Sequence, residues 1–167
     1  LKSKIIDNII KVNRDHELIL YNNIDNWPKY SVNELYVDFE TFTDVCENID
    51  NIPTQNKFSI IFMIGVGFKD EQNNWKYKSY ICKNKTKKEE KIIIEQFYND
   101  YIKLRRPKIY YWSAEKKIWK KSCDDHKLKK RIKWIDMYEL FKYHNIAIKN
   151  CFGYGLKNIV KSMKEHG

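Results

Sequence analysis

The sequence lacks any apolar run long enough to cross a membrane. Its longest such run, residues 58–68, has 11 residues, about half of the ~20 that a spanning helix needs. This run is uncharged and rich in Ile and Phe, which is typical of a buried strand. The first eleven residues lack the cleavage site of a secretory signal. We therefore predict an intracellular protein, cytoplasmic or nuclear, with no membrane partner. The chain begins with Leu rather than Met, which suggests a piece of a longer protein.

Paired cysteines are also missing. The four cysteines are widely separated and form no CxxC pair: Cys46, Cys82, Cys123 and Cys151. Cys123 and His126 have the spacing of half a zinc site, but no second half follows, which argues against a structural zinc. Free thiols in a reducing compartment are the simpler interpretation. The remaining histidines show no catalytic spacing and are interpreted as surface residues: His16, His144 and His166.

No repeat or low-complexity linker divides the chain, and we expect no second domain. With 167 residues, of which 43% are hydrophobic and 15% aromatic, the chain is long enough to bury a core and unlike a disordered segment. Residues 1–33 are expected to form an N-terminal helix and an irregular approach segment. Residues 34–167 are expected to form the domain itself.

The net charge of +10 is concentrated in the middle third of the chain. Residues 83–133 hold 18 Lys and Arg against 7 Asp and Glu, an excess of 11. Such a basic region is typical of a surface that binds a nucleic-acid backbone. Lys, Asn and Ile together are also what an AT-rich genome favours, so composition bias is an alternative origin of the charge. That alternative explains the clustering less well.

The most informative segment places Asp38 and Glu40 two residues apart inside an apolar run. Alternate residues of a strand point to the same face, so both carboxylates project together, while Val37 and Phe39 point into a core. Two adjacent like charges repel unless a cation neutralises them. Hard ions such as Mg²⁺ or Mn²⁺ take carboxylate oxygens as ligands. The segment therefore predicts half of a metal site, although a half-exposed strand also alternates polar and apolar residues.

The hydrophobic periodicity predicts an α/β protein with a mixed sheet. A helix over residues 3–13 precedes the order βββαβαβα, which ends in another helix. The first three strands, joined by short turns, form an antiparallel meander, and helix-linked strands follow. Thr86 and Glu89 have the spacing of a capping box that opens a helix. The predicted elements after the first helix cover residues 35–40, 58–68, 75–81, 87–104, 108–112, 114–130 with a break near Ser122, 134–136, a helix from 136, and 156–163.

This order is that of the ribonuclease H-like fold, and five segments carry a closer resemblance. Residues 36–41 resemble the first motif of the DEDD (DnaQ-like) 3′–5′ exonucleases, an Asp-x-Glu on the first strand. Taken together, these segments make the chain most similar to the YprB-type ribonuclease H-like domain. The resemblance spans about residues 35–165 and is carried by residues 36–41, 60–67, 109–115, 134–138 and 152–159.

The resemblance implies two Mg²⁺ or Mn²⁺ ions and a catalytic set of four carboxylates. Asp38 would bridge both ions, and Glu40 would bind one and orient the nucleophilic water. Glu115 would close the site as a further ligand, although a carboxylate at a helix N-terminus is also favourable by itself. Asp136 would act at the site, although with Glu139 it equally fits a helix N-cap.

Nucleic acid, with DNA as the expected form, is the implied partner. The expected backbone contacts are lysines that follow Glu115 or open the last helix, and a solvated helix face is their alternative: Lys116, Lys117, Lys120, Lys121 and Lys157. Three aromatic residues near Glu115 could stack on bases, but core positions are favoured for most of them: Tyr110, Tyr111 and Trp112.

Two functions are compatible with the sequence. The first is a metal-dependent nuclease domain that hydrolyses phosphodiester bonds, as a 3′–5′ exonuclease on DNA. The second is a catalytically inactive ribonuclease H-like module of a larger protein that binds nucleic acid or a protein partner. The retained Asp38 and Glu40 favour the first. The third exonuclease motif, which should follow the last helix, does not appear before Gly167, and this favours the second.

Overall fold

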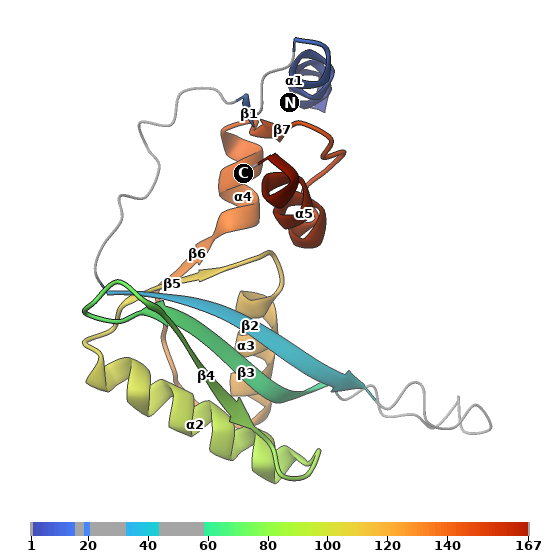
Figure 1. Cartoon of the computed structure of the whole chain (residues 1–167). Coiled ribbons are helices and arrows are strands. Elements are labelled where there is room, and N and C mark those ends of the chain that lie inside the picture. The colour runs from blue at the N-terminus through green and yellow to red at the C-terminus, as the bar shows by residue number, and fades with distance from the viewer. Residues whose placement is uncertain (1, 16–18, 21–32, 44–58, 167) are drawn as a thin grey trace, which may run out of the picture. The chain divides into compact units, whose positions relative to one another are not determined.

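A computed structural model describes residues 2–15, 19–20, 33–43 and 59–166 of the chain (Figure 1). The chain divides into two compact units. The larger unit comprises residues 31–135, and the smaller one comprises residues 1–30 together with residues 136–167.

The larger unit is built on the five-stranded sheet, whose strand order is β4-β3-β2-β5-β6. Strands β2 (Glu34–Thr43), β3 (Ser59–Lys69) and β4 (Trp75–Ile81) form an antiparallel meander. Strand β5 (Lys108–Tyr111) pairs with β2 in parallel. Strand β6 (Trp134–Asp136) lies next to β5 and reaches the boundary between the two units. The predicted α/β class with a mixed sheet is confirmed.

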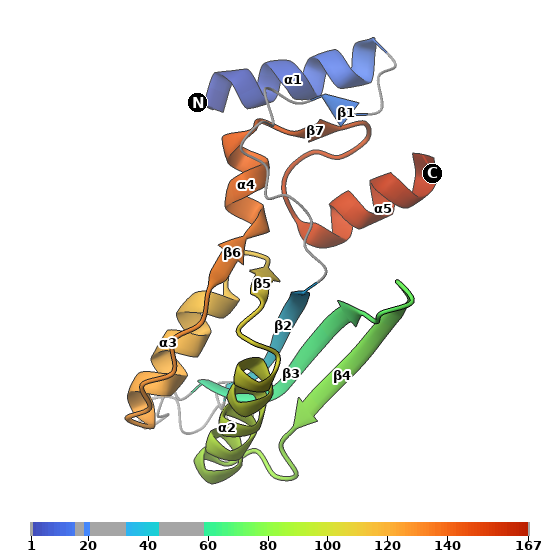
Figure 2. The same cartoon turned by 90° about the vertical axis from the view of Figure 1, so that its left-hand side faces the viewer.

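Helices α2 (Lys87–Lys103) and α3 (Glu115–Asp125) bury their apolar residues against one face of this sheet (Figure 2). Val37 and Phe39 of β2 share a core with Phe97 of α2 and Trp119 of α3. The rings of Phe39 and Trp119 lie 6.2 Å apart, and those of Phe97 and Trp119 lie 5.4 Å apart. The apolar residues of β2 therefore face the helices, as strand alternation requires.

The start of α2 follows the predicted capping signal. The Thr86 hydroxyl accepts a hydrogen bond from the backbone N–H of Glu89 at 3.3 Å. This satisfies one of the N–H groups that a first helical turn leaves without an intrahelical partner.

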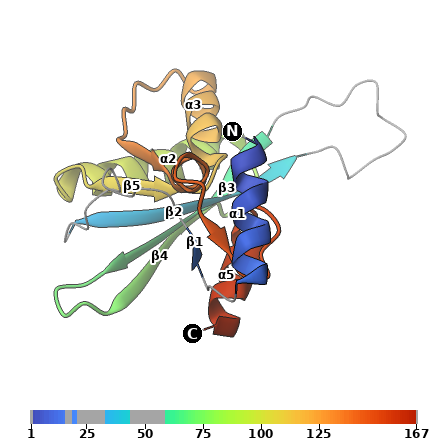
Figure 3. The same cartoon turned by 90° about the horizontal axis from the view of Figure 1, so that it is seen from above.

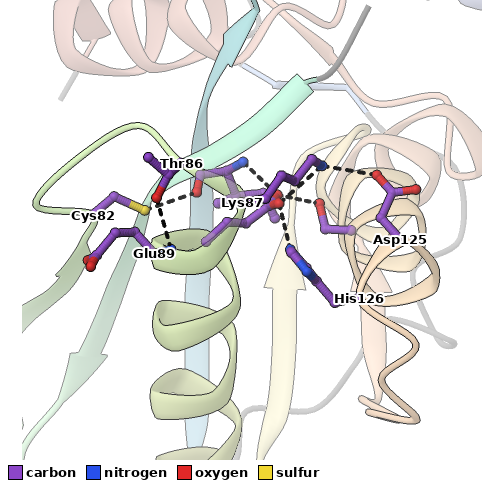
Figure 4. A network of polar contacts seen from close by, with 9 residues as sticks. Cys82, Thr86, Lys87, Glu89, Asp125 and His126 are labelled. Atoms are coloured by element: carbon purple, nitrogen blue, oxygen red, sulfur yellow. Dashed lines mark hydrogen bonds and ion pairs between the residues drawn. The ribbon is translucent and has the colours of Figure 1, made fainter. Parts of the chain in front are cut away.

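A buried carboxylate ties α2 to α3 and to β3 (Figure 4). Glu90 has 0% of its surface exposed. Its Oε1 accepts hydrogen bonds from the Ile61 N–H at 2.9 Å and from the Ser122 hydroxyl at 2.8 Å. Its Oε2 lies 2.8 Å from His126 Nε2 and 3.2 Å from Lys87 Nζ. The sequence pattern around Glu90 does not distinguish it from other charged residues of a helix start.

The ends of two elements differ from the prediction. Strand β2 runs on to Thr43, beyond the expected end at residue 40, and residues 44–58 of the expected connection lie outside the described part. Helix α3 ends at Asp125 instead of continuing to residue 130. There Lys127 adopts a φ of 56°, and the Leu128 N–H bonds back to the Cys123 carbonyl at 2.8 Å. This left-handed turn is a common way to end a helix.

The smaller unit contains α1 (Lys2–Arg14), α4 (Met137–Tyr143) and α5 (Leu156–His166), and a two-stranded antiparallel sheet of β1 (Ile19–Leu20) and β7 (Ala147–Ile148). The two short strands were not predicted, because two-residue pairings leave no periodic pattern in the sequence.

The interpretation of His144 as a surface residue is wrong. Its exposed fraction is 2%, and it directly follows the last residue of α4, where its N–H bonds to the Leu140 carbonyl at 3.0 Å. Three cysteines of the described residues, Cys82, Cys123 and Cys151, are buried free thiols, as expected. Cys46 lies outside the described residues. Within the described part of the chain, no helix combines the length and apolar character that crossing a membrane requires.

Candidate nuclease site

The two carboxylates of the Asp-x-Glu segment lie on β2, the central strand of the sheet. Asp38 and Glu40 are exposed, whereas Val37 and Phe39 between and beside them are buried. The pair therefore projects from the face of the sheet opposite α2 and α3, as the alternation predicts. In the antiparallel register, Asp38 lies opposite Gly65 of β3.

Glu115 reaches the site through a sharp turn between β5 and α3. Strand β5 ends at Tyr111, and Glu115 is the first residue of α3. Between them, Ser113 adopts a φ of 80°, a conformation that side-chain-bearing residues rarely take. Holding such a residue costs on the order of 1–3 kcal/mol, and such strain is concentrated at functional sites. The sequence contained no signal for it, since the position holds Ser rather than Gly or Asn.

The Glu115 carboxyl group is buried and lies within electrostatic reach of Asp38. Glu115 is 6% exposed, and its Oε2 has no hydrogen-bond partner. Burial raises the pKa of Glu115, and the negative charge of Asp38 raises it further. Hydrogen bonds from the backbone N–H groups of Glu115, Ala114 and Trp112 lower this pKa, but by less, so the pKa stays above its ordinary value. The fold thus brings together two of the predicted ligands, Asp38 and Glu115, from segments 77 positions apart in the sequence.

The raised pKa of Glu115 predicts a pH-dependent stability difference. A carboxyl group with a raised folded-state pKa stabilises the protein fully below its unfolded pKa of about 4.3, and this contribution is lost as the pH rises through the folded pKa. Glu115→Gln should therefore have a higher Tm than the wild type at pH 7–8 and a similar Tm near pH 4. Thermal unfolding between pH 4 and 8 without divalent metal measures this. Parallel Tm profiles would contradict it.

The donor set suits a hard divalent cation but is incomplete. An unpartnered buried oxygen of Glu115, beside the charge of Asp38, is the kind of position that a cation stabilises. Within residues 33–43 and 59–166, however, no three His, Cys, Asp or Glu side chains gather closely enough to form a metal centre. Asp38 and Glu115 lie within electrostatic reach of each other, and the part of Glu40 as a further ligand stays a prediction.

Asp136 caps α4. Its Oδ1 accepts a hydrogen bond from the Glu139 N–H at 3.3 Å, so the N-cap alternative holds. Asp136 belongs to the smaller unit, and its part in catalysis stays a prediction.

The two roles of Asp136 can be separated by substitution. Asn is as good an N-cap as Asp, so Asp136→Asn should keep the stability of the wild type, whereas Asp136→Ala should lose about 1 kcal/mol. If Asp136 also acts at the site, Asp136→Asn will lower cleavage without lowering Tm. Urea unfolding and a nuclease assay on the same preparations measure both. Unchanged cleavage in Asp136→Asn would leave the cap as its function.

The predicted backbone-binding lysines are exposed. Four of them occupy the solvent side of α3, and the fifth lies on α5: Lys116, Lys117, Lys120, Lys121 and Lys157. Trp119 and Cys123 of α3 are buried, so the helix presents one basic and one apolar face. These lysines are accessible to a polyanion, and their role in binding stays a prediction.

The aromatic residues next to the site are divided between core and surface. Tyr110 and Tyr111 are 5% and 7% exposed, which agrees with the expected core positions, and Trp112 is half-buried. Trp75 and Tyr77 of β4 are instead 61% and 66% exposed. The sequence alternation in β4 predicted a polar face of Lys76, Lys78 and Tyr80. This is wrong for Tyr80, which is the residue of the strand that packs into the core.

The mixed sheet and the carboxylates on and beside its central strand define an α/β domain of ribonuclease H-like architecture. A model of the RNase H superfamily matches residues 35–166, most of the chain, and the chain therefore belongs to this superfamily. Membership indicates a nuclease or nucleic-acid-binding function. No curated protein and no solved structure matches the chain significantly.

Proposed function

We propose that this protein is a metal-dependent nuclease that hydrolyses phosphodiester bonds, as a 3′–5′ exonuclease of the DEDD type acting on DNA. The observation that carries the proposal is the buried carboxyl group of Glu115, whose Oε2 lacks a hydrogen-bond partner and which lies within electrostatic reach of Asp38. A purely structural carboxylate at a helix start would face water, where its charge is cheapest. The resemblance of residues 36–41 to the first exonuclease motif supports the DEDD assignment.

The residues of the site would have different roles in the reaction. Asp38, Glu40 and Glu115 would hold Mg²⁺ or Mn²⁺, which when bound activates water and stabilises the leaving oxygen. The exposed position of Glu40 allows its carboxylate to accept a hydrogen bond from the attacking water. Lys116 and Lys117 follow Glu115 directly and are exposed, so they would supply positive charge for the phosphodiester backbone near the start of α3.

A second candidate function is a catalytically inactive module that binds nucleic acid or a protein partner. The absence of a three-residue metal cluster among the described residues favours this alternative. Such a module would use the exposed lysines of α3 without needing the carboxylates of β2.

End-labelled DNA and RNA, single- and double-stranded, distinguish the two functions. With Mg²⁺ or Mn²⁺, the nuclease should shorten a 5′-labelled strand stepwise from its 3′ end, and EDTA should stop the reaction. A preference for RNA would contradict the assignment to DNA, and cleavage inside the strand would contradict the assignment as an exonuclease. Metal-independent binding with no cleavage of any substrate would establish the inactive module instead.

A further inference from the structure

The open face of the five-stranded sheet carries aromatic side chains that the fold leaves in solvent. Trp75 and Tyr77 of β4 are 61% and 66% exposed, and Tyr36 of β2 is 38% exposed. Figure 3 shows β4 and its hairpin with β3 at the edge of the sheet away from α3. Exposed aromatic residues that gather on one surface mark binding sites more often than scattered ones do. We call Tyr36, Trp75 and Tyr77 the aromatic platform.

Two glycines of β3 have no side chain in the way and so allow these rings to pack against the sheet. The Trp75 ring crosses β3 to within 5.4 Å of the Tyr36 ring, and it passes 3.9 Å from the position that a Cβ on Gly67 would occupy. The Tyr77 hydroxyl lies 2.7 Å from the corresponding position on Gly65. A side chain on Gly65 would force Tyr77 to move. The platform is therefore a built surface rather than loose side chains at an edge.

The platform adjoins the carboxylate site. Asp38 lies two residues from Tyr36 on the same face of β2, and its partner across the strands is Gly65, beneath Tyr77. At the other end, Lys69 Nζ lies 5.5 Å above the Trp75 ring. A positive charge, flat rings and two carboxylates thus follow one another across one face of the sheet.

We propose that the aromatic platform stacks the bases of single-stranded nucleic acid and leads the strand to Asp38, an inference that rests on the proposed nucleic-acid function. Every base offers a π-face, and aromatic side chains stack on it without sequence preference. In a duplex, the bases are stacked on one another and their faces are not accessible to such rings. Lys69 beside Trp75 complements the phosphates. The platform therefore selects single strands, while the lysines of α3 hold either form by charge.

Fluorescence anisotropy of labelled 20-nucleotide oligo(dT) and of a 20-base-pair duplex tests this with the whole chain. The measurements are made in EDTA, so that binding is read without cleavage. Trp75→Ala combined with Tyr77→Ala should weaken oligo(dT) binding at least about tenfold and leave duplex binding nearly unchanged. Trp75→Phe combined with Tyr77→Phe should keep most of the affinity, because Phe still offers a ring. The salt dependence of binding should not change in either variant, since no cation is removed.

Tyr143→Ala, which removes an aromatic side chain that is 69% exposed on the smaller unit, is the matched control and should bind like the wild type. Equal losses for oligo(dT) and duplex, or no loss in the double alanine variant, would overturn the proposal. A wild-type dimer that the double alanine variant abolishes in sedimentation would also overturn it, since a second copy would then cover the platform. Binding in EDTA is independent of cleavage, so the platform and the nuclease proposal can fail separately.

Discussion

Glu90→Ala is expected to lower the free energy of unfolding by about 3–5 kcal/mol, the usual cost of breaking a buried charged network by removing one partner. The carboxylate is completely buried and has four partners on three elements. Without it, the Ile61 N–H and the Ser122 hydroxyl lose their acceptor in the interior. An unsatisfied buried group costs more than the hydrogen bond itself contributed.

Urea unfolding followed by circular dichroism measures this loss, and Glu95→Ala is the matched control. Glu95 lies on the same helix but is only half-buried, so its substitution should change stability by about 0.5 kcal/mol or less. Glu90→Gln keeps the size and one acceptor oxygen and should fall between the two. A Glu90→Ala variant as stable as the control would show that the network in Figure 4 contributes little to the fold.

Asp38→Asn is expected to reduce metal-dependent cleavage by about 10²–10³-fold, because a lost metal ligand removes several kcal/mol of transition-state stabilisation. The Asn side chain is nearly the same size and Asp38 is exposed, so the fold should not change. Without the negative charge near Glu115, the pKa of Glu115 should also fall towards its ordinary value.

The same variant has a readout that does not depend on turnover. Mg²⁺ that binds only the folded protein raises its Tm, and this increase should be large in the wild type and small in Asp38→Asn. Asp124→Asn, which changes an exposed carboxylate near the other end of α3, should behave like the wild type in cleavage and in the Tm shift. Cleavage by Asp38→Asn at the wild-type rate would remove Asp38 from the site.

Local patterns in the sequence predicted much of the fold. The alternation around Asp38 placed both carboxylates on one face of a strand, because a period of two is a property of the backbone itself. The third strand and the short strand before α4 have the predicted bounds, and the spacing of Thr86 and Glu89 marked the start of α2. The turns on either side of α3 were harder to predict, since the positive φ of Ser113 before the helix and of Lys127 after it falls on residues without a preference for it.

The partners of each carboxylate depend on contacts between distant segments. Glu115 approaches Asp38 because β5 pairs in parallel with β2, with Tyr110 opposite Tyr36. In the sequence, Glu90 is an ordinary charged residue near the start of a helix. It is buried because α3 and β3 pack around it. Single-sequence patterns contain no register between strands, and so they identify which residues can form a site but not which of them meet.

The sequence alone thus determined the periodicity of the side chains along each strand and helix. This periodicity in turn determined the α/β class and placed Asp38 and Glu40 on one face. Burial was decided only when the chain packed: it enclosed Glu90 and Glu115 and left Trp75 and Tyr77 in solvent. The reason is physical, since periodicity follows from backbone geometry within a few residues, whereas desolvation and the pKa of a carboxyl group depend on every element that comes to lie beside it.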